Sequence, residues 1–295
     1  MNIIHLSDTH VGYGDNEALF RKIVDDLTKA RPCDPSRHLV IHTGDLIHDA
    51  ASTTAREAAR ALLEELSAFG YCVLLCPGNH DYGNSLLMSK RHAEDFRDAF
   101  EDFFHLDGGI CAMHFHTLKY AAEDIFPILH IIDDVALIGL DSCWAEMNWS
   151  ERFFAEGKVG LEQLLTLNML LDRPELAGKK IVVYLHHHPF YYGYSVKPDI
   201  SEANVLFNWF ARVTRPFRRL KDAHSLNQVI RDRVQVLLFG HMHFGLDCRS
   251  DSQKYGIPLA FDASSSTCTA MDTDRMRYRI INLDTMTAEM RFLMM

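Results

Sequence analysis

The chain has 295 residues, of which 47% are hydrophobic and 24% are charged. This composition excludes intrinsic disorder, collagen and coiled coil. The formal net charge is −10, which disfavours sequence-independent binding of nucleic acid, because such binding needs a broad basic face. Histidine is unusually frequent, at 17 residues, so metal or proton chemistry is expected.

No targeting or membrane-spanning segment is visible in the sequence. The longest apolar stretches, such as Ile181 to Leu185, have the length of a strand, whereas a membrane helix needs about 20 residues. The seven cysteines are scattered, which favours reduced thiols over a disulfide framework. Cys72 and Cys76 are expected to be small buried apolar residues. We therefore expect a cytoplasmic protein that does not bind membranes.

The first third of the chain alternates between apolar runs and helical patterns. Strands are expected at residues 2–6, 38–42 and 71–76. Helices are expected at residues 16–30 and 53–69, where apolar residues recur at helical spacing. Pro77-Gly78 ends the third strand. This alternation predicts parallel strands that are covered by helices.

The remainder of the chain is richer in strands. Helices are expected at residues 89–105 and 161–171, and the expected strands are 128–133, 135–140, 179–185, 234–239, 257–261, 278–283 and 287–292. Residues 190–224 form an insertion rich in aromatic residues and arginine. Since no repeat or linker divides the chain, we expect one α/β domain over residues 1–295, with two sheets and helices outside them.

Five of the expected strands are each followed by Asp, Asn or His. These segments are Ser7-Asp8-Thr9-His10, Thr43-Gly44-Asp45, Pro77-Gly78-Asn79-His80-Asp81, His186-His187-His188-Pro189 and Gly240-His241-Met242-His243. In open α/β sheets, ligands bind at the carboxyl ends of the strands. Carboxylate, amide and imidazole ligands suit Mn, Fe, Zn or Co, and the absence of cysteine disfavours a closed structural zinc site. Seven ligands fit two ions that share one carboxylate.

The spacing within the segments gives a reason for their pairing. Residues two apart on an extended backbone face the same way, so Asp8 and His10 can face one site. Glycines at positions 44, 78 and 240 allow tight turns beside the metals. A lone Asp-x-His is more often a cap or a turn. Five such segments in order favour a metal centre.

The whole set of segments resembles the calcineurin-like metallophosphoesterase superfamily, over residues 5–243 and nearly the whole chain. The resemblance implies a four-layer sandwich of two mixed β-sheets flanked by α-helices, with two metal ions (Mn, Fe or Zn). By this resemblance, the first ion would be held by Asp8, His10, Asp45 and His243. The second would be held by Asp45, Asn79, His186 and His241. His187 is the alternative to His186, because the three consecutive histidines align with the family motif in two ways.

The same resemblance implies hydrolysis of a phosphoric ester, with a metal-bridging hydroxide attacking phosphorus. His80 is expected to contact the phosphate and to protonate the leaving alkoxide; the alternative is that it only orients Asn79. A carboxylate should orient His80. Some family members place one where this chain has His48, so Asp49 is the first choice and Asp81 the second.

The motif pattern is most similar to that of bacterial class III cyclic-nucleotide phosphodiesterases, so a small diester is the expected substrate. A phosphomonoesterase or a nucleotide-pyrophosphate hydrolase is the alternative. A DNA repair-type nuclease is less favoured because few residues follow His243. A non-catalytic scaffold is less favoured because every ligand of the family motif is present. In the insertion, Arg212 and Arg215 are candidate substrate-binding residues; the alternative is a solvated helix face. The run from Ser264 to Thr267 either approaches the metals or forms a plain turn.

Overall fold

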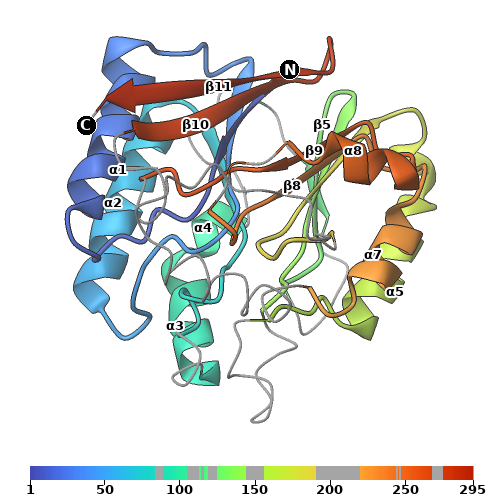
Figure 1. Ribbon diagram of the computed structural model, residues 1–295, viewed down its shortest axis with the longest axis horizontal. Coiled ribbons are helices and arrows are strands. Elements are labelled where there is room, and N and C mark those ends of the chain that lie inside the picture. The colour runs from blue at the N-terminus through green and yellow to red at the C-terminus, as the bar shows by residue number, and fades with distance from the viewer. Residues whose placement is uncertain are drawn as a thin grey trace, which may run out of the picture.

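A computed structural model of the chain describes residues 1–83, 89–104, 113, 116–118, 125–143, 156–190, 220–243, 245, 247–267 and 275–294. The described strands form two mixed sheets (Figure 1). The first has the order β11-β10-β1-β2-β3 and the second the order β4-β5-β6-β7-β8-β9. The strands are β1 (Asn2–Leu6), β2 (His38–His42), β3 (Cys72–Leu75), β4 (His116–Leu118), β5 (Ile128–Ile132), β6 (Val135–Gly139), β7 (Lys180–Tyr184), β8 (Val236–Phe239), β9 (Leu259–Asp262), β10 (Arg275–Asn282) and β11 (Thr287–Met294).

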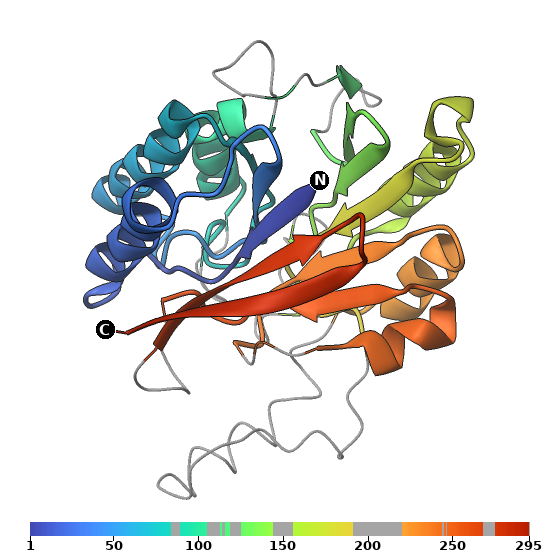
Figure 2. The ribbon, with the colours of Figure 1, turned by 90° about the horizontal axis from the view of Figure 1, so that it is seen from above.

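Helices cover the outer faces of both sheets, so the molecule has four layers (Figure 2). Beside the first sheet lie α1 (Asn16–Asp25), its π-helical extension η1 (Asp26–Ala30), α2 (Thr53–Phe69), α3 (Lys90–Ala99) and α4 (Glu101–Phe104). Beside the second sheet lie α5 (Leu161–Leu171), η4 (Pro174–Leu176), α7 (Ala223–Ile230), α8 (Arg249–Ser252) and η6 (Gln253–Tyr255). The predicted four-layer α/β sandwich is confirmed.

Alternating side chains of the second sheet serve two different cores. In β6, Val135 and Leu137 belong to the larger core, which includes the residues of the first sheet. Ala136 and Ile138 belong to the smaller core, in which Leu167 of α5 also lies. Because successive side chains of a strand point to opposite faces, a sheet covered on both sides needs uninterrupted apolar runs. Each fully buried large aliphatic side chain contributes about 1.5–3 kcal/mol.

Helix α2 has the predicted bounds because both of its ends are capped. The Ser52 hydroxyl accepts a hydrogen bond from the Ala55 amide at 3.2 Å. Gly70 ends the helix with φ at 112°, a left-handed conformation that glycine adopts without a steric penalty. These are standard start and stop signals, and they can be seen in the sequence.

Other elements depart from the prediction. The helix expected over residues 89–105 is broken at Phe100 into α3 and α4. Strand β4 was not predicted, since three residues carry little pattern and the strand is defined by its antiparallel pairing with β5. Helix α7 begins at Ala223, inside the segment predicted as an insertion. Of that segment, Phe190 is buried and packs on Phe239 with ring centroids 5.8 Å apart.

One expectation about the cysteines is wrong. Cys72 is buried, as predicted, but it is disulfide-bonded. Among the described residues, the other cysteines are buried and carry thiols that are not in a disulfide: Cys33, Cys76, Cys143 and Cys248. Spacing within the sequence did not indicate this bond, because pairing depends on which strands and loops become neighbours.

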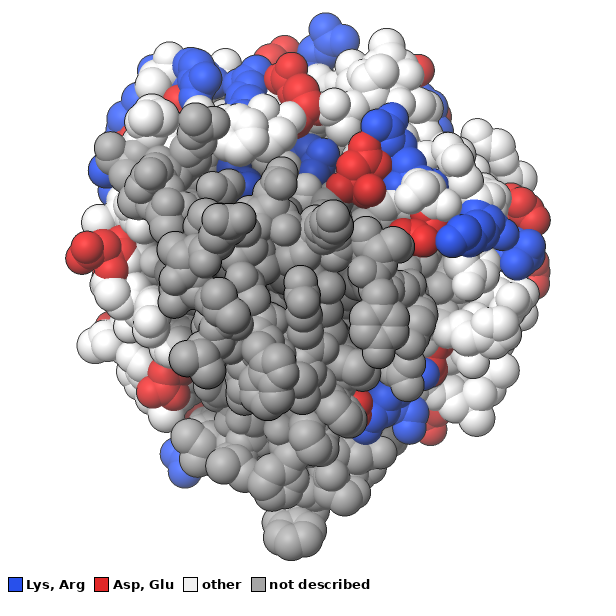
Figure 3. All heavy atoms as spheres, in the orientation of Figure 1, with Lys and Arg blue, Asp and Glu red and all other residues white. Residues whose placement is uncertain are grey.

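Charges of both signs are mixed on the described surface. On the face drawn in Figure 3, lysine and arginine side chains are interspersed with aspartate and glutamate over the described part. No described helix is both long and apolar enough to cross a membrane. Arg212 and Arg215, the candidate substrate-binding residues, lie outside the described residues.

Candidate metal centre

The five predicted segments meet at one place, between the two sheets. Strands β1, β2 and β3 are parallel neighbours in the first sheet, so their carboxyl ends lie on one edge. Strands β7 and β8 are parallel neighbours in the second sheet. Hydrogen bonds join the loops that follow them: the Asp8 amide donates to the Gly44 carbonyl at 3.0 Å and the Gly240 amide to the His186 carbonyl at 3.0 Å. The His241 amide donates to the Asp8 carboxylate at 3.0 Å and thereby connects the two sheets.

One group of side chains consists of Asp8, His10, Asp45 and His243, whose potential ligand atoms all lie within 4.8 Å of one another. The Nε2 atoms of His10 and His243 are 3.3 Å apart. His243 Nε2 lies 3.0 Å from Asp8 Oδ1, and His10 Nε2 lies 3.8 Å from Asp45 Oδ2. This is the set that the resemblance assigns to the first ion, and we call it the first half-site.

The second group consists of Asp45, His186 and His241, again within 4.8 Å of one another, together with Asn79. His186 Nε2 is at its middle, 3.3 Å from Asp45 Oδ2, 3.2 Å from Asn79 Oδ1 and 3.2 Å from His241 Nδ1. We call this set the second half-site. Asp45 belongs to both half-sites, as the sequence analysis expected for a shared carboxylate.

The tertiary structure distinguishes His186 from its neighbour His187. His186 Nδ1 donates to the Thr43 carbonyl at 2.8 Å, which turns Nε2 toward the second half-site. The ring of His187 instead contacts the Ser142 hydroxyl through Nδ1 at 2.8 Å. The group that could hold a metal therefore contains His186 and not His187.

Burial and charge shift the pKa values of these groups in opposite directions. Burial lowers the pKa of His10 to about 3, so its imidazole is neutral and has a free lone pair. Burial alone would also lower the pKa of His186, but the Asp45 carboxylate raises it to about 10. Burial alone would raise the pKa of Asp45, yet the neighbouring His186 and His80 hold it well below its usual range. Asp45 is therefore ionised.

The donor set fits two cations. Around His186 Nε2, three atoms that normally accept or ligate lie within 3.3 Å, and one proton can satisfy only one of them. His10 Nδ1 is buried without a hydrogen-bond partner. Buried lone pairs that converge in this way are costly unless a positive charge lies among them. Carboxylate, amide and imidazole together suit Mn, Fe, Zn or Co.

The backbone reason for the pairing differs from the predicted one. Asp8 and His10 are not extended: their φ angles are 51° and 46°, in the left-handed region, and His241 and His243 are at 74° and 59°. Asp45 has φ at 52°. Left-handed non-glycine residues cost of order 1–3 kcal/mol each and are concentrated at functional sites. Asp8 and His10 do face one half-site, as expected, whereas His241 and His243 belong to different half-sites. Strained loops beyond the strands place all four residues.

Glycine is required at two of these turns by space. A Cβ atom on Gly78 would collide with the amide and carboxylate of Asp45. A Cβ atom on Gly240 would collide with the side chains of Ser7 and Asp8. Neither residue is among those with positive φ, so close packing of the loops, and not left-handed backbone, explains these two glycines.

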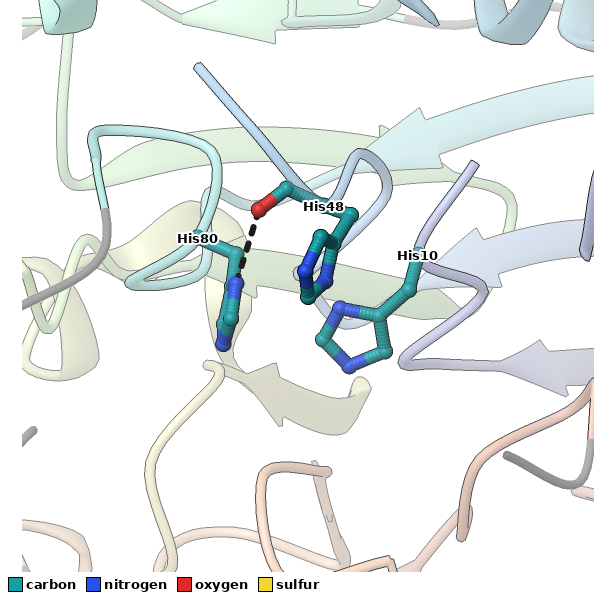
Figure 4. Close-up of side chains that lie close together, drawn as sticks. All are labelled: His10, His48 and His80. Atoms are coloured by element: carbon teal, nitrogen blue, oxygen red, sulfur yellow. Dashed lines mark hydrogen bonds between the residues drawn. The ribbon is translucent and has the colours of Figure 1, made fainter. Parts of the chain in front are cut away.

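His80 lies beside the first half-site, with its ring centroid 4.7 Å from that of His10. Its Nδ1 donates to the main-chain carbonyl of His48 at 2.9 Å, as Figure 4 shows. The His48 ring stacks on the His80 ring, with centroids 5.0 Å apart. The three imidazoles come from three different loops and form a further group whose nitrogens lie within 4.8 Å of one another.

The carbonyl of His48 occupies the role for which a carboxylate was expected. Asp49 Oδ1 accepts from the Ala51 amide at 3.0 Å, within its own turn. Asp81 accepts from the Ile47 amide at 3.0 Å and from the Gly78 amide at 2.8 Å. Asp81 therefore holds together the two loops that carry Asp45 and Asn79.

Hydroxyl side chains that sequence reasoning left open support the main chain of the centre. Ser264 donates to the His243 carbonyl at 3.0 Å, Ser265 to the Asp8 carbonyl at 2.8 Å and Thr267 to the Thr9 carbonyl at 3.0 Å. The run of small hydroxyl residues after β9 was the available signal. Its targets could not be predicted, because they are carbonyl groups more than 200 residues earlier or on another loop.

Fold and site together define a two-sheet α/β protein with a candidate dinuclear metal centre between the sheets. A sequence profile described as calcineurin-like phosphoesterase matches residues 1–245. The chain belongs to this family, which is dimetal-dependent and hydrolyses phosphoesters. A sequence search of curated proteins finds no match.

Three solved structures are similar to this chain at low sequence identity, and for one of them the TM-score is above 0.5. A dimetal phosphatase from Danio rerio is 15% identical, with a TM-score of 0.52 over 94% of this chain and 95% of that one. The calcineurin-like phosphoesterase YfkN from Bacillus subtilis is 11% identical, with a TM-score of 0.48 over 100% and 90%. An archaeal phosphodiesterase is 13% identical, with a TM-score of 0.40 over 99% and 100%. At 15% identity, the likeness to the Danio rerio phosphatase concerns the fold alone.

Proposed function

We propose that the chain is a phosphodiesterase that hydrolyses a small diester such as a cyclic nucleotide, with two metal ions in the half-sites. The first would be held by Asp8, His10, Asp45 and His243. The second would be held by Asp45, Asn79, His186 and His241. Two such cations supply hydroxide at neutral pH and offset negative charge on the phosphoryl oxygens.

The charge of the centre carries the diester assignment. The assigned ligands are carboxylates, one amide and imidazoles, and none of them is a lysine or an arginine. A diester phosphate has one negative charge, whereas a monoester has nearly two at neutral pH, because its second pKa is about 6. The dianion gains more than the diester from a further cation, such as lysine or arginine, beside the metals. The diester, with one negative charge, needs less positive charge from the site.

His80 is the proposed acid. With Nδ1 donating to the His48 carbonyl, the ring presents Nε2 as its remaining nitrogen. A proton held on Nε2 can pass to the leaving oxygen of the ester, and such a step typically contributes 10²–10⁴-fold. The Asp45 carboxylate accepts the His80 amide at 2.8 Å, so the proposed acid and the shared ligand are fixed relative to each other.

The test compares two substrates on the purified protein loaded with Mn²⁺. We expect faster hydrolysis of bis-p-nitrophenyl phosphate than of p-nitrophenyl phosphate, followed by activity on cyclic nucleotides. A faster reaction with the monoester would replace the proposal with a phosphomonoesterase. With two equivalents of metal confirmed by mass spectrometry, inactivity on both would contradict the diesterase assignment.

Each of the less favoured functions predicts a different result in these assays. Cleavage of a nucleotide pyrophosphate with neither p-nitrophenyl ester hydrolysed would indicate the pyrophosphate hydrolase. Degradation of linear DNA would indicate the nuclease. An Asp45→Asn variant as active as the unmodified chain would show that the dinuclear assignment is incorrect.

A further inference from the structure

Strand β11 is an open edge of the first sheet. It has eight residues, and in the described part of the chain it pairs with β10 alone. Figures 1 and 2 both show it as the outermost strand of its sheet. An edge strand presents unpaired main-chain N–H and C=O groups, which are a template for pairing with another strand. Proteins usually shorten, twist or cover such edges.

The side chains of β11 do not protect the edge in the usual way. Phe292 is 46% exposed and Met294 is 74% exposed. Its charged residues, Glu289 and Arg291, are two positions apart and of opposite sign, with the Arg291 Nε 3.3 Å from the Glu289 carboxylate. A strand that carries one sign of charge repels its own copy. This one does not.

A hollow of about 530 Å³ lies at the middle of the strand. It is lined by Arg31, Pro32, Cys33, Glu289, Met290 and Arg291. The Arg291 guanidinium lies 3.8 Å from the Cys33 sulfur, so it is on the side of the sheet that faces this hollow. The Arg31 guanidinium is held by Asp26, with contacts of 2.8 and 3.0 Å. Two oriented guanidinium groups therefore border the hollow.

We propose that β11 is a self-association surface, which pairs antiparallel with β11 of a second copy of this chain. A twofold axis at Met290 would place Glu289 opposite Arg291 of the second copy, and Arg291 opposite its Glu289. The same register places Ala288 opposite Phe292. Opposite charges in facing positions stabilise an antiparallel pair, and like charges destabilise it.

The hollow agrees with this register. Residues 289 and 291 are two positions apart, so their side chains lie on the same face of the strand. This is the face on which Arg291 approaches Cys33. The Glu289 carboxylate of the second copy would therefore enter on the side of the two guanidinium groups. Pairing would join two sheets into one and cover the exposed apolar side chains near the end of β11.

The experiment measures the mass of the full chain in solution by sedimentation velocity over a range of concentrations. We expect a reversible dimer. Glu289→Arg places like charges opposite each other on both sides of the axis, so it should weaken association by about tenfold or more. The double variant Glu289→Arg with Arg291→Glu exchanges the charges, and it should restore the dimer.

Two controls separate the interface from stability. Arg173 and Glu175 form a similar exposed ion pair two residues apart, beside the second sheet, and Glu175→Arg should leave the dimer unchanged. Amide hydrogen exchange should be slower in β11 of the unmodified chain than in Glu289→Arg. A monomer at all concentrations, or a dimer that Glu289→Arg leaves intact with β11 amides unprotected, would overturn the proposal.

Discussion

The two half-sites share Asp45 but differ in burial and support. In the second half-site, the His186 side chain is fully buried, and its Nε2 has three neighbours within 3.3 Å. In the first, the His243 side chain is 22% exposed, and the rings of His48 and His80 lie beside His10. The difference indicates that the second half-site is the more rigid one. The first opens toward the groups proposed to act on the substrate.

The shared ligand gives the largest expected effect. Asp45→Asn keeps the shape of the side chain and removes its charge, so both half-sites lose their common anion. We expect metal content to fall at both sites, and diester hydrolysis to fall by more than the 10–100-fold that loss of an outer partner causes. Metal analysis after dialysis checks this. Retention of two ions would mean that Asp45 is not shared.

Loss of one imidazole from each half-site sharpens the comparison. His186→Ala removes the centre of the second half-site, and His243→Ala removes the exposed ligand of the first. We expect each variant to retain one ion. The loss of affinity at the altered half-site should be larger for His186→Ala than for His243→Ala, and in both it should exceed the 10–100-fold that loss of an outer partner causes. Isothermal titration with Mn²⁺ measures both. Substitution of His224, an exposed residue on α7, is the control, and equal losses would contradict the difference in rigidity.

His80 is expected to matter for the reaction and not for metal content. His80→Ala should lower kcat by 10²–10⁴-fold on esters with alkoxide leaving groups. The loss should be smaller on p-nitrophenyl esters, because p-nitrophenolate leaves without a proton. The unmodified chain and His80→Ala are compared on both kinds of ester, with two ions confirmed bound. The same loss on both substrates would assign His80 to a positioning role.

The smallest expected effects come from two serines that support the main chain. Ser142 accepts the His187 amide at 3.2 Å, next to the ligand of the second half-site. Ser265 donates to the Asp8 carbonyl of the first. Ser142→Ala should weaken only the second ion and Ser265→Ala only the first, each by about 10-fold. A competition assay with a metal indicator measures this, and an effect of both variants on the same ion would show that the half-sites are not independently supported.

Most of the fold was predictable because its signals are local. The Ala-rich and Leu-rich periodicity of residues 53–69, with Ser52 before it and Gly70 after it, predicts α2 with its observed bounds. The apolar runs of β1 and β2 predict strands with their observed ends. Strand β4 was missed because its three residues form a strand only through pairing with β5.

The candidate site divides in the same manner. The ligand types and the order of the five segments follow from the sequence, and the structure brings those segments together. The orientation of His80 by the His48 carbonyl does not follow, since every residue has a carbonyl group and no side-chain pattern marks the one that is used. The same is true of the serine and threonine hydroxyls that donate to Asp8, Thr9 and His243.

The sequence by itself determined which side chains are available at the strand ends, and thereby the family and the chemistry of the donor set. Only the tertiary structure shows that the His186 ring, and not that of His187, lies beside Asp45 and Asn79, and that a left-handed backbone aims Asp8 and His10. It also decided the disulfide at Cys72. The physical reason is that residue type and periodicity act over a few residues. The position of a lone pair to within 1 Å depends instead on hydrogen bonds and packing between segments that are far apart in the chain.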